Sequence, residues 1–294
     1  YVVVGLAAGA SDGKIAAYLW SDGKLHAAWS KHVGDHVCAL TTVSGYVAAA
    51  IGHEVHTYAM EPHALTFRRP WDCAFVSSCL ASQGSTLVVG DAMHSLTVLT
   101  VAEDGRLSES ARDLHPYWTS AVCVLDEEQQ RYLGTDVAMN LFVAERAKGT
   151  EPESPWSHVM RHAAACHVGD LVNAIHTLPG GRVMYATASG ALGTLVHVPE
   201  PVARVLLCVQ DAMIEVVPAP GDIPWESWRT SRTDTRTEPP HHILDADVLR
   251  FFVSNPSVRS PCLDKAGSLA QARDIPMAEM AEERILHMLH ALLS

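Results

Sequence analysis

Residues 86–101 read Thr-Leu-Val-Val-Gly-Asp-Ala-Met-His-Ser-Leu-Thr-Val-Leu-Thr-Val, an apolar strand that ends in a small residue, then a polar turn and a second apolar strand. Aliphatic and β-branched residues on both sides of a short polar break are typical of two antiparallel strands. The same unit recurs as YVVVGLAAG, YVAAAIGHEVHTYAM, RYLGTDVAMNLFVAE and RVMYATASGALGTLVHV. Repetition of one unit indicates a repeat architecture.

The repeats are spaced at the length of a propeller blade. The small residues that mark each unit are 47, 38, 44 and 52 residues apart, at Gly5, Gly52, Gly90, Gly134 and Ala186. One four-stranded blade takes roughly 40 to 50 residues. We therefore predict that residues 1–198 form about four to five WD-like blades of an incomplete β-propeller of the seven-bladed type. A β-sandwich also spaces its strands evenly, but it gives no reason for one signature to recur at this period.

Turn signals separate the strands, among them Ser-Asp-Gly at 11–13 and 21–23 and Pro-Gly-Gly at 179–181. The chain opens on a strand already under way, and a propeller ring needs neighbouring blades to cover its terminal ones. We therefore expect the sequence to be a piece of a longer protein.

After residue 198 the apolar period changes from two to about 3.6, which predicts a propeller-closing segment and a small α-helical C-terminal domain over 199–294. The first helix carries one apolar face, made of Val202, Val205, Leu206, Val209, Met213 and Val216. A second helix is predicted to begin after Asp245, a good N-cap, and a third at about Pro276. Residues 254–273 lack periodicity and are predicted to be a mobile loop.

Composition limits the function. The 294 residues carry 21 Lys and Arg against 33 Asp and Glu, a formal charge of −12 that would repel a polyphosphate backbone. We therefore expect nucleic acid to be met only indirectly, through partners. No apolar run reaches the roughly 18 to 20 residues that span a bilayer, so no membrane association is expected. The 7 scattered cysteines form no Cys-x-x-Cys pair, which favours a reducing compartment.

Chemistry-bearing motifs are missing from the sequence. It contains no Gly-x-Ser-x-Gly, phosphate-binding loop, His-Glu-x-x-His or dinucleotide fingerprint, so we expect neither an enzyme nor a cofactor. Among the 17 histidines, the pairs His241–His242 and His287–His290 suggest metal binding. No cysteine or carboxylate completes either pair at ligand spacing, and we predict no metal site.

Several segments, read in order, resemble the family of damaged-DNA-binding protein 1. They are Tyr1-Val-Val-Val-Gly5, Ser21-Asp-Gly-Lys-Leu25, Leu87-Val-Val-Gly-Asp91, Ala111-Arg-Asp113 with Pro116 and Trp118, Asn140-Leu-Phe-Val143, Val168-Gly-Asp170, Val172-Asn173, Trp228-Arg229, Arg236-Thr-Glu-Pro239 and 243–247. They are similar to the third propeller and helical domain of that family. The large subunit of the cleavage and polyadenylation specificity factor and a splicing factor 3b subunit share its architecture.

The resemblance implies a non-enzymatic scaffold of a nuclear, and also cytoplasmic, ubiquitin ligase concerned with DNA damage recognition and repair. In that family the adaptor joins cullin-4, through another propeller, to WD-repeat-type substrate receptors. A receptor helix inserts between the first and third propellers, so this chain would supply one wall of the cleft. The alternative functions are a pre-mRNA processing scaffold of the same fold and, from another class, a propeller hydrolase with carboxylates in its channel.

Six residues are candidates for the receptor-binding surface. Trp118 is the foremost candidate, because Trp is enriched at binding hot spots. The alternative interpretation is that Trp118 closes the hydrophobic layer of a blade. Asn173 is polar within an apolar strand, where it either meets a partner or satisfies its own turn. His94 stands where the family's Gly-Asp-x-Met-Arg-Ser segment has arginine, and imidazole cannot form the same fork of donors. Ala7, Leu171 and Leu195 match the same apolar face, with burial in the core as their default alternative.

Overall fold

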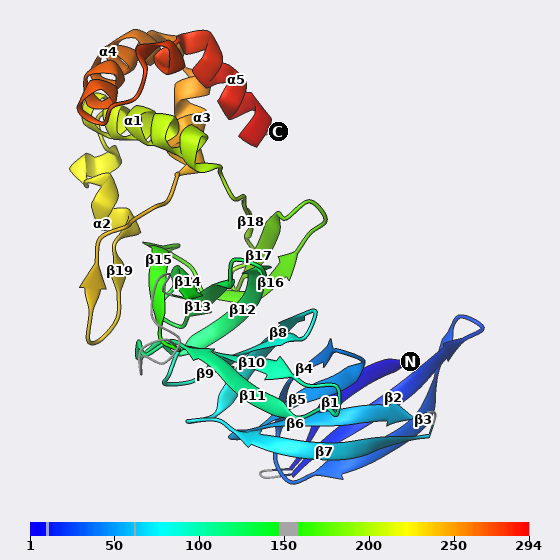
Figure 1. The fold of residues 1–294 in the computed structure, drawn as a ribbon. Coiled ribbons are helices and arrows are strands. Elements are labelled where there is room, and N and C mark those ends of the chain that lie inside the picture. Colours follow the sequence, from blue (N-terminus) through cyan, green and yellow to red (C-terminus); the bar gives the residue numbers. More distant parts are fainter. Residues whose placement is uncertain (10–11, 62, 147–157, 294) are drawn as a thin grey trace.

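The computed structural model contains five antiparallel β-sheets in sequence order, followed by a helical segment. It describes residues 1–9, 12–61, 63–146 and 158–293, with the backbone alone for residues 7–9. Figure 1 shows the sheets following one another from β1 to β18 and the helices gathered beyond the last of them. The described part of the chain is therefore mostly β, with a small helical C-terminal part, as predicted.

The sheets have the strand order of propeller blades, in which sequence neighbours pair. The first sheet contains β1 (Val2–Gly9), β2 (Asp12–Ser21) and β3 (Lys24–Val33). The second contains β4 (Val37–Val43), β5 (Tyr46–Ile51), β6 (Glu54–Glu61) and β7 (Ala64–Asp72). The third contains β8 (Ser77–Gln83), β9 (Thr86–Asp91), β10 (Leu96–Val101) and β11 (Leu107–Arg112).

The two remaining sheets complete the series. The fourth contains β12 (Thr119–Asp126), β13 (Arg131–Asp136), β14 (Asn140–Arg146) and β15 (Met160–His167). The fifth contains β16 (Val172–Thr177), β17 (Val183–Thr187) and β18 (Leu192–Leu195). The first strands of successive sheets, β4, β8, β12 and β16, contact one another. They are the inner strands of a radial array, which confirms the prediction of a propeller.

Hydrogen bonds tie one inner strand to the next. Ser78 Oγ on β8 donates to the carbonyl of Thr119 on β12 at 2.7 Å, and Ser120 Oγ on β12 donates to the carbonyl of Val172 on β16 at 2.8 Å. Both serines are the second residue of their inner strand, so the same bond occurs at two successive blade junctions.

The small marker residues allow neighbouring blades to approach closely. A Cβ atom added at Gly5 would lie 2.6 Å from Val37 Cγ1, and one at Gly90 would lie 3.0 Å from Thr119 Cγ2. Val37 and Thr119 each begin the inner strand of the following sheet. A side chain at either glycine would therefore push the next blade outward. Gly52 differs from the other markers because it lies in the turn after β5.

The helical segment contains α1 (Glu200–Val216), α2 (Trp225–Arg229), α3 (Ala246–Ser254), α4 (Pro256–Ala272) and α5 (Glu282–Leu293), with short 3-10 turns at Pro220–Asp222 and Met277–Met280. The structure confirms the first helix and the second, whose N-cap is Asp245, with its side chain accepting from Asp247 N. The third predicted helix begins at Glu282, after the 3-10 turn, and not at Pro276.

The prediction of a mobile loop over 254–273 is wrong, because α4 occupies this stretch. Its buried residues are Cys262, Ala266, Gly267 and Ala270, a helical face made of small side chains that packs against α1. A search for large apolar residues at helical spacing does not detect such a face. Pro256 lies in the first turn, where its missing N–H costs little, although Pro261 lies within the helix.

A two-stranded hairpin, β19 (Ser231–Arg232) and β20 (Thr237–Glu238), connects the helices to the fourth sheet. Asn140 Nδ2 donates to the carbonyl of Arg232 at 2.9 Å, and Ala165 and His241 exchange backbone hydrogen bonds. None of the helices in the described ranges is long and apolar enough to cross a membrane.

We expect the isolated 294-residue chain to self-associate. In the described residues β18 has β17 as its only strand neighbour, which leaves one row of its backbone hydrogen-bonding groups without a strand partner. Sedimentation should therefore report oligomers whose share grows with protein concentration. A monodisperse monomer that melts cooperatively over the same concentrations would contradict this expectation.

Candidate protein-docking face

The residue that precedes each of the inner strands β4, β8, β12 and β16 is held by the same backbone hydrogen bond. Its carbonyl accepts from the turn between the second and third strands of the same sheet. The four bonds run from Gly52 N to His36 O (3.2 Å), Ala92 N to Val76 O (3.0 Å), Val137 N to Trp118 O (3.0 Å) and Ala188 N to Leu171 O (2.8 Å). The four accepting residues therefore occupy equivalent positions, at the same end of successive sheets.

Large apolar side chains are exposed around these positions. Trp118 is 57% exposed, which excludes its place in a hydrophobic layer. Six exposed apolar residues of these loops and turns form what we call the loop face. They are Phe75, Val76, Met93, Trp118, Val137 and Met139. Several large apolar residues exposed at the same end of neighbouring blades are typical of a protein-binding surface.

Buried aspartates fix the loops that carry this surface. Asp91 is 3% exposed, and its carboxylate accepts from the backbone N–H groups of Met93 (2.7 Å), His94 (3.0 Å) and Phe75 (2.8 Å). In the next blade Asp136, whose pKa is raised by burial, accepts from the backbone N–H of Asn140 at 2.9 Å. These bonds fix the backbone, so the apolar side chains are presented without a large ordering cost.

Three of the residues predicted from the sequence lie together at this end of the blades. Trp118 and Leu171 occupy the equivalent position in neighbouring blades, Trp118 exposed and Leu171 half-buried. His94 is exposed in the turn between β9 and β10, next to Met93. These three side chains offer apolar contact, one indole N–H donor and one imidazole.

Asn173 lies at the same end but in a different setting. It is exposed, it is the second residue of β16 within a β-bulge, and it forms no side-chain hydrogen bond with the described residues. Ser78 and Ser120 hold the equivalent position in the two preceding blades, where each donates to the next inner strand. Asn173 therefore lies where the two preceding blades have a donor to the next inner strand.

The remaining two predicted residues differ in position. Leu195 is the last residue of β18 and pairs with Val183, at the opposite end of the fifth sheet from Leu171. It is partly buried and packs against a cluster that includes Cys123 and Leu141. Ala7 pairs with Gly13 near the end of β1, and its side chain lies outside the described residues.

Sequence reasoning missed most of the loop face. A signal for part of it was present, because Met93 and Met139 follow the turn aspartates in Asp-Ala-Met and Asp-Val-Ala-Met. Exposed methionines in equivalent turns fit a binding surface, since Met adapts its shape to a partner. Val76 and Phe75 had no such signal, because an aliphatic or aromatic residue beside a strand is expected to be buried.

The family model described as the CPSF A subunit region matches residues 4–254. The chain belongs to this family. Among curated members of similar sequence, DNA damage-binding protein 1a of Arabidopsis thaliana is 27% identical over 260 residues, 82% of this chain and 24% of that protein. DNA damage-binding protein 1 of Solanum lycopersicum is 27% identical over 277 residues, 87% of this chain and 25% of that protein.

A third relative comes from an animal. DNA damage-binding protein 1 of Drosophila melanogaster is 27% identical over 258 residues, which cover 82% of this chain and 22% of that protein. This CPSF A family chain thus spans about a quarter of the length of the relatives it matches.

Proposed function

We propose that this chain is the C-terminal part of a cullin-4 type ubiquitin ligase adaptor, which holds WD-repeat-type substrate receptors. The adaptor serves the recognition and repair of damaged DNA. The protein is proposed to lie in the nucleus and also in the cytoplasm. One observation carries the proposal: exposed or half-exposed apolar residues occupy the equivalent loop position in three successive blades, at Val76, Trp118 and Leu171. The names of the similar proteins supply the connection to DNA damage.

The loop face suits the apolar side of a helix. An amphipathic helix binds through apolar residues spaced one turn apart, and it needs a surface whose own side chains are already positioned. Rigid inner strands and buried aspartates position the loop face. Trp118 offers the largest contact area, and it is the residue type most enriched where truncation costs the most binding energy.

A binding role fits the loop face, because its exposed side chains are apolar. The carboxylates of Asp91 and Asp136, close to the same end of the blades, are occupied by backbone donors of their own loops. This arrangement disfavours the propeller hydrolase, which needs free acids in its channel.

Affinity purification of the tagged full-length protein tests the proposal. We expect cullin-4 and WD-repeat receptors to co-purify. The family description names the CPSF A subunit, which favours a pre-mRNA processing scaffold as the second candidate. Recovery of polyadenylation or splicing subunits, without cullin, would establish that candidate and refute the first.

We expect direct binding of duplex DNA by the purified chain to be weaker than micromolar at physiological salt. Its net charge of −12 opposes contact with phosphates, and counterion release needs clustered Lys and Arg. Fluorescence anisotropy across a salt series measures this. Submicromolar binding that falls steeply as salt rises would contradict the proposal that DNA is met through partners.

We expect His94→Arg to strengthen receptor capture by roughly tenfold, because an arginine fork adds a charge-assisted hydrogen bond worth about 1.5 kcal/mol at this exposed turn. Quantitative co-purification from the full-length protein measures the change. His94→Gln is the matched control, since it replaces the imidazole without adding the fork. Equal capture by both variants would show that no acceptor of the receptor faces this position.

A further inference from the structure

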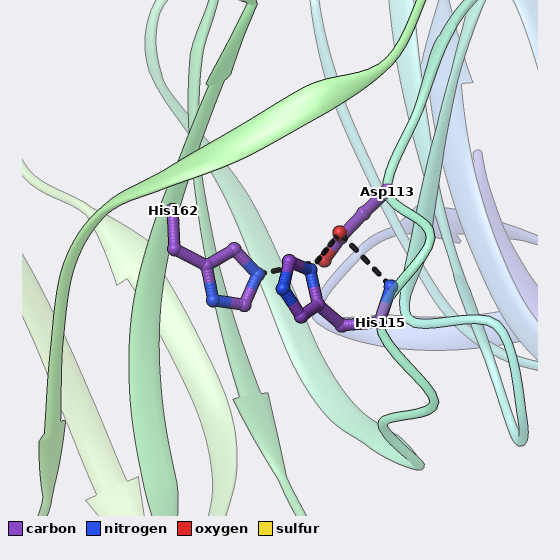
Figure 2. Close-up of side chains that lie close together, drawn as sticks. All are labelled: Asp113, His115 and His162. Carbon is purple, nitrogen blue, oxygen red and sulfur yellow. Dashed lines mark hydrogen bonds and ion pairs between the residues drawn. The ribbon is translucent and has the colours of Figure 1, made fainter. Parts of the chain in front are cut away.

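Two histidines and an aspartate converge where the third blade meets the fourth. Asp113 follows β11, His115 lies in the loop that leads to Trp118, and His162 lies on β15. His162 Nε2 is 2.8 Å from Asp113 Oδ2, and His115 Nδ1 is 2.5 Å from Asp113 Oδ1. Figure 2 shows both imidazole rings beside the carboxylate, brought there from different parts of the sheet array.

The three side chains have the composition of a metal-ligand set. One ligand atom from each lies within 4.8 Å of the other two. Two imidazoles and one carboxylate form a common three-ligand set for Zn²⁺, in which a fourth position is left for water or another ligand. The Asp113 side chain is 0% exposed and the His162 side chain 5%, whereas the His115 side chain is 21% exposed. An ion would therefore enter from the side of His115.

Contacts around the set hold each group in place. Ser95 Oγ donates to Asp113 Oδ2 at 2.7 Å and the backbone N–H of His115 donates to Oδ1 at 3.2 Å, so the carboxylate keeps two donors when the imidazole protons leave. The ring of His162 stacks on Phe142 at 4.8 Å between centroids and on His115 at 3.9 Å. Such outer contacts orient ligands in metal sites.

Metal binding through Nε2 would set the tautomer of His162. A ligating Nε2 requires the ring proton to be on Nδ1. Nδ1 of His162 is buried and has no hydrogen-bond partner among the described residues, so no donor fixes it as an acceptor. When an ion takes Nε2 the proton lies on Nδ1, where the described residues offer no acceptor, and this unsatisfied donor lowers the affinity of the site.

We propose that Asp113, His115 and His162 bind a divalent cation of the Zn²⁺ type, which ties the third blade, the loop before Trp118 and the fourth blade together. Tetrahedral bonds of 2.0–2.1 Å place ligand atoms roughly 3.3 Å apart. The two imidazole nitrogens lie 2.8 and 2.5 Å from different oxygens of Asp113, so the nitrogen that shares the ligating oxygen must move back by about 0.5–0.8 Å. The His115 side chain is 21% exposed, whereas the His162 side chain is 5% exposed and stacked on Phe142, so His115 is the ligand that has to move more.

Titration of the chelator-treated full-length protein with Co²⁺, followed by visible absorption, tests the site. We expect the wild-type protein to bind one equivalent more than His115→Asn or His162→Asn, with the absorption of tetrahedral cobalt. His158→Asn is the matched control, since His158 is an exposed histidine next to the same sheet junction but outside the set. Zn²⁺ at a hundredfold excess over its dissociation constant should raise the melting temperature of the propeller by roughly 5 °C.

A second variant gives a gained signal. His115→Cys replaces an imidazole with a thiolate at the solvent side of the set, and it should add a sulfur-to-cobalt charge-transfer band in the near ultraviolet. Circular dichroism establishes that each variant is folded, and His115 variants decide the matter if His162→Asn does not fold. Two results would overturn the proposal: no cobalt absorption from folded wild-type protein, or an unchanged spectrum in both His115 variants.

Discussion

Trp118→Ala should release substrate receptors from the full-length protein, with a loss of affinity of roughly thirtyfold. Truncation of an interface tryptophan costs about 2 kcal/mol or more, because the partner loses a large apolar contact that excluded water. Trp118 is more than half exposed, and its backbone carbonyl accepts the hydrogen bond from the neighbouring turn. The substitution therefore leaves the blade intact. Titration of a purified receptor measures the loss, and cullin-4 attachment should be unchanged.

The matched control for this variant is Trp228→Ala. Trp228 has a similar exposure of 53%, and it lies on α2, outside the residues that define the loop face. Its truncation should leave receptor affinity within twofold of wild type. Equal affinity of the folded Trp118 variant and the wild-type protein would place the receptor elsewhere. A lower melting temperature would mean that Trp118 stabilises the blade.

Asp245→Ala should destabilise α3 by about 3 kcal/mol, the cost typical of removing one partner from a buried ion pair. The Asp245 carboxylate accepts from Arg229 Nε (2.8 Å), Trp225 Nε1 (2.9 Å) and the backbone N–H of Asp247 (3.0 Å). The variant loses the N-cap and leaves Arg229 unpaired. Hydrogen–deuterium exchange of residues 246–254 should then become roughly a hundredfold faster.

Asp247→Ala is the control for this experiment, because Asp247 is exposed in the same first turn and contributes through its charge alone. Lowering the pH should reproduce this loss of α3 stability in the wild-type protein. Burial raises the pKa of Asp245, but hydrogen bonds from Arg229 and Trp225 outweigh it and hold that pKa below its ordinary value. The stabilisation is therefore complete above about pH 4 and is lost as the pH falls through the lower folded-state pKa. Identical exchange in both variants would contradict this role.

The sequence was sufficient for the sheet array because the blade signature is local. Gly5 and Gly90 mark strands on which the next inner strand packs, and the requirement for a small residue there appears directly in the sequence. The helix α4 escaped prediction for the opposite reason. Its buried face uses Cys262, Ala266 and Gly267, and small residues pack closely without producing an apolar stripe.

The candidate surface was predictable only in part. Trp118 was found through its residue type and the family resemblance, whereas Val76 becomes visible only when the loop hydrogen bonds align successive blades. The proposed metal ligands were missed because a search by spacing compares residues near one another in sequence. Asp113 and His115 are neighbours, but His162 comes from the outer strand of the next blade.

Because of the repeated loop bond, the side chains of this surface and the fold of the blade can change independently in evolution. The position before each inner strand is held by its backbone carbonyl, and it carries side chains as different as those of His36, Val76 and Trp118. Selection can therefore exchange the side chain at this position without rebuilding the blade beneath it. A duplicated gene would acquire new partners by changing a few such residues, while its folding stability stayed nearly constant.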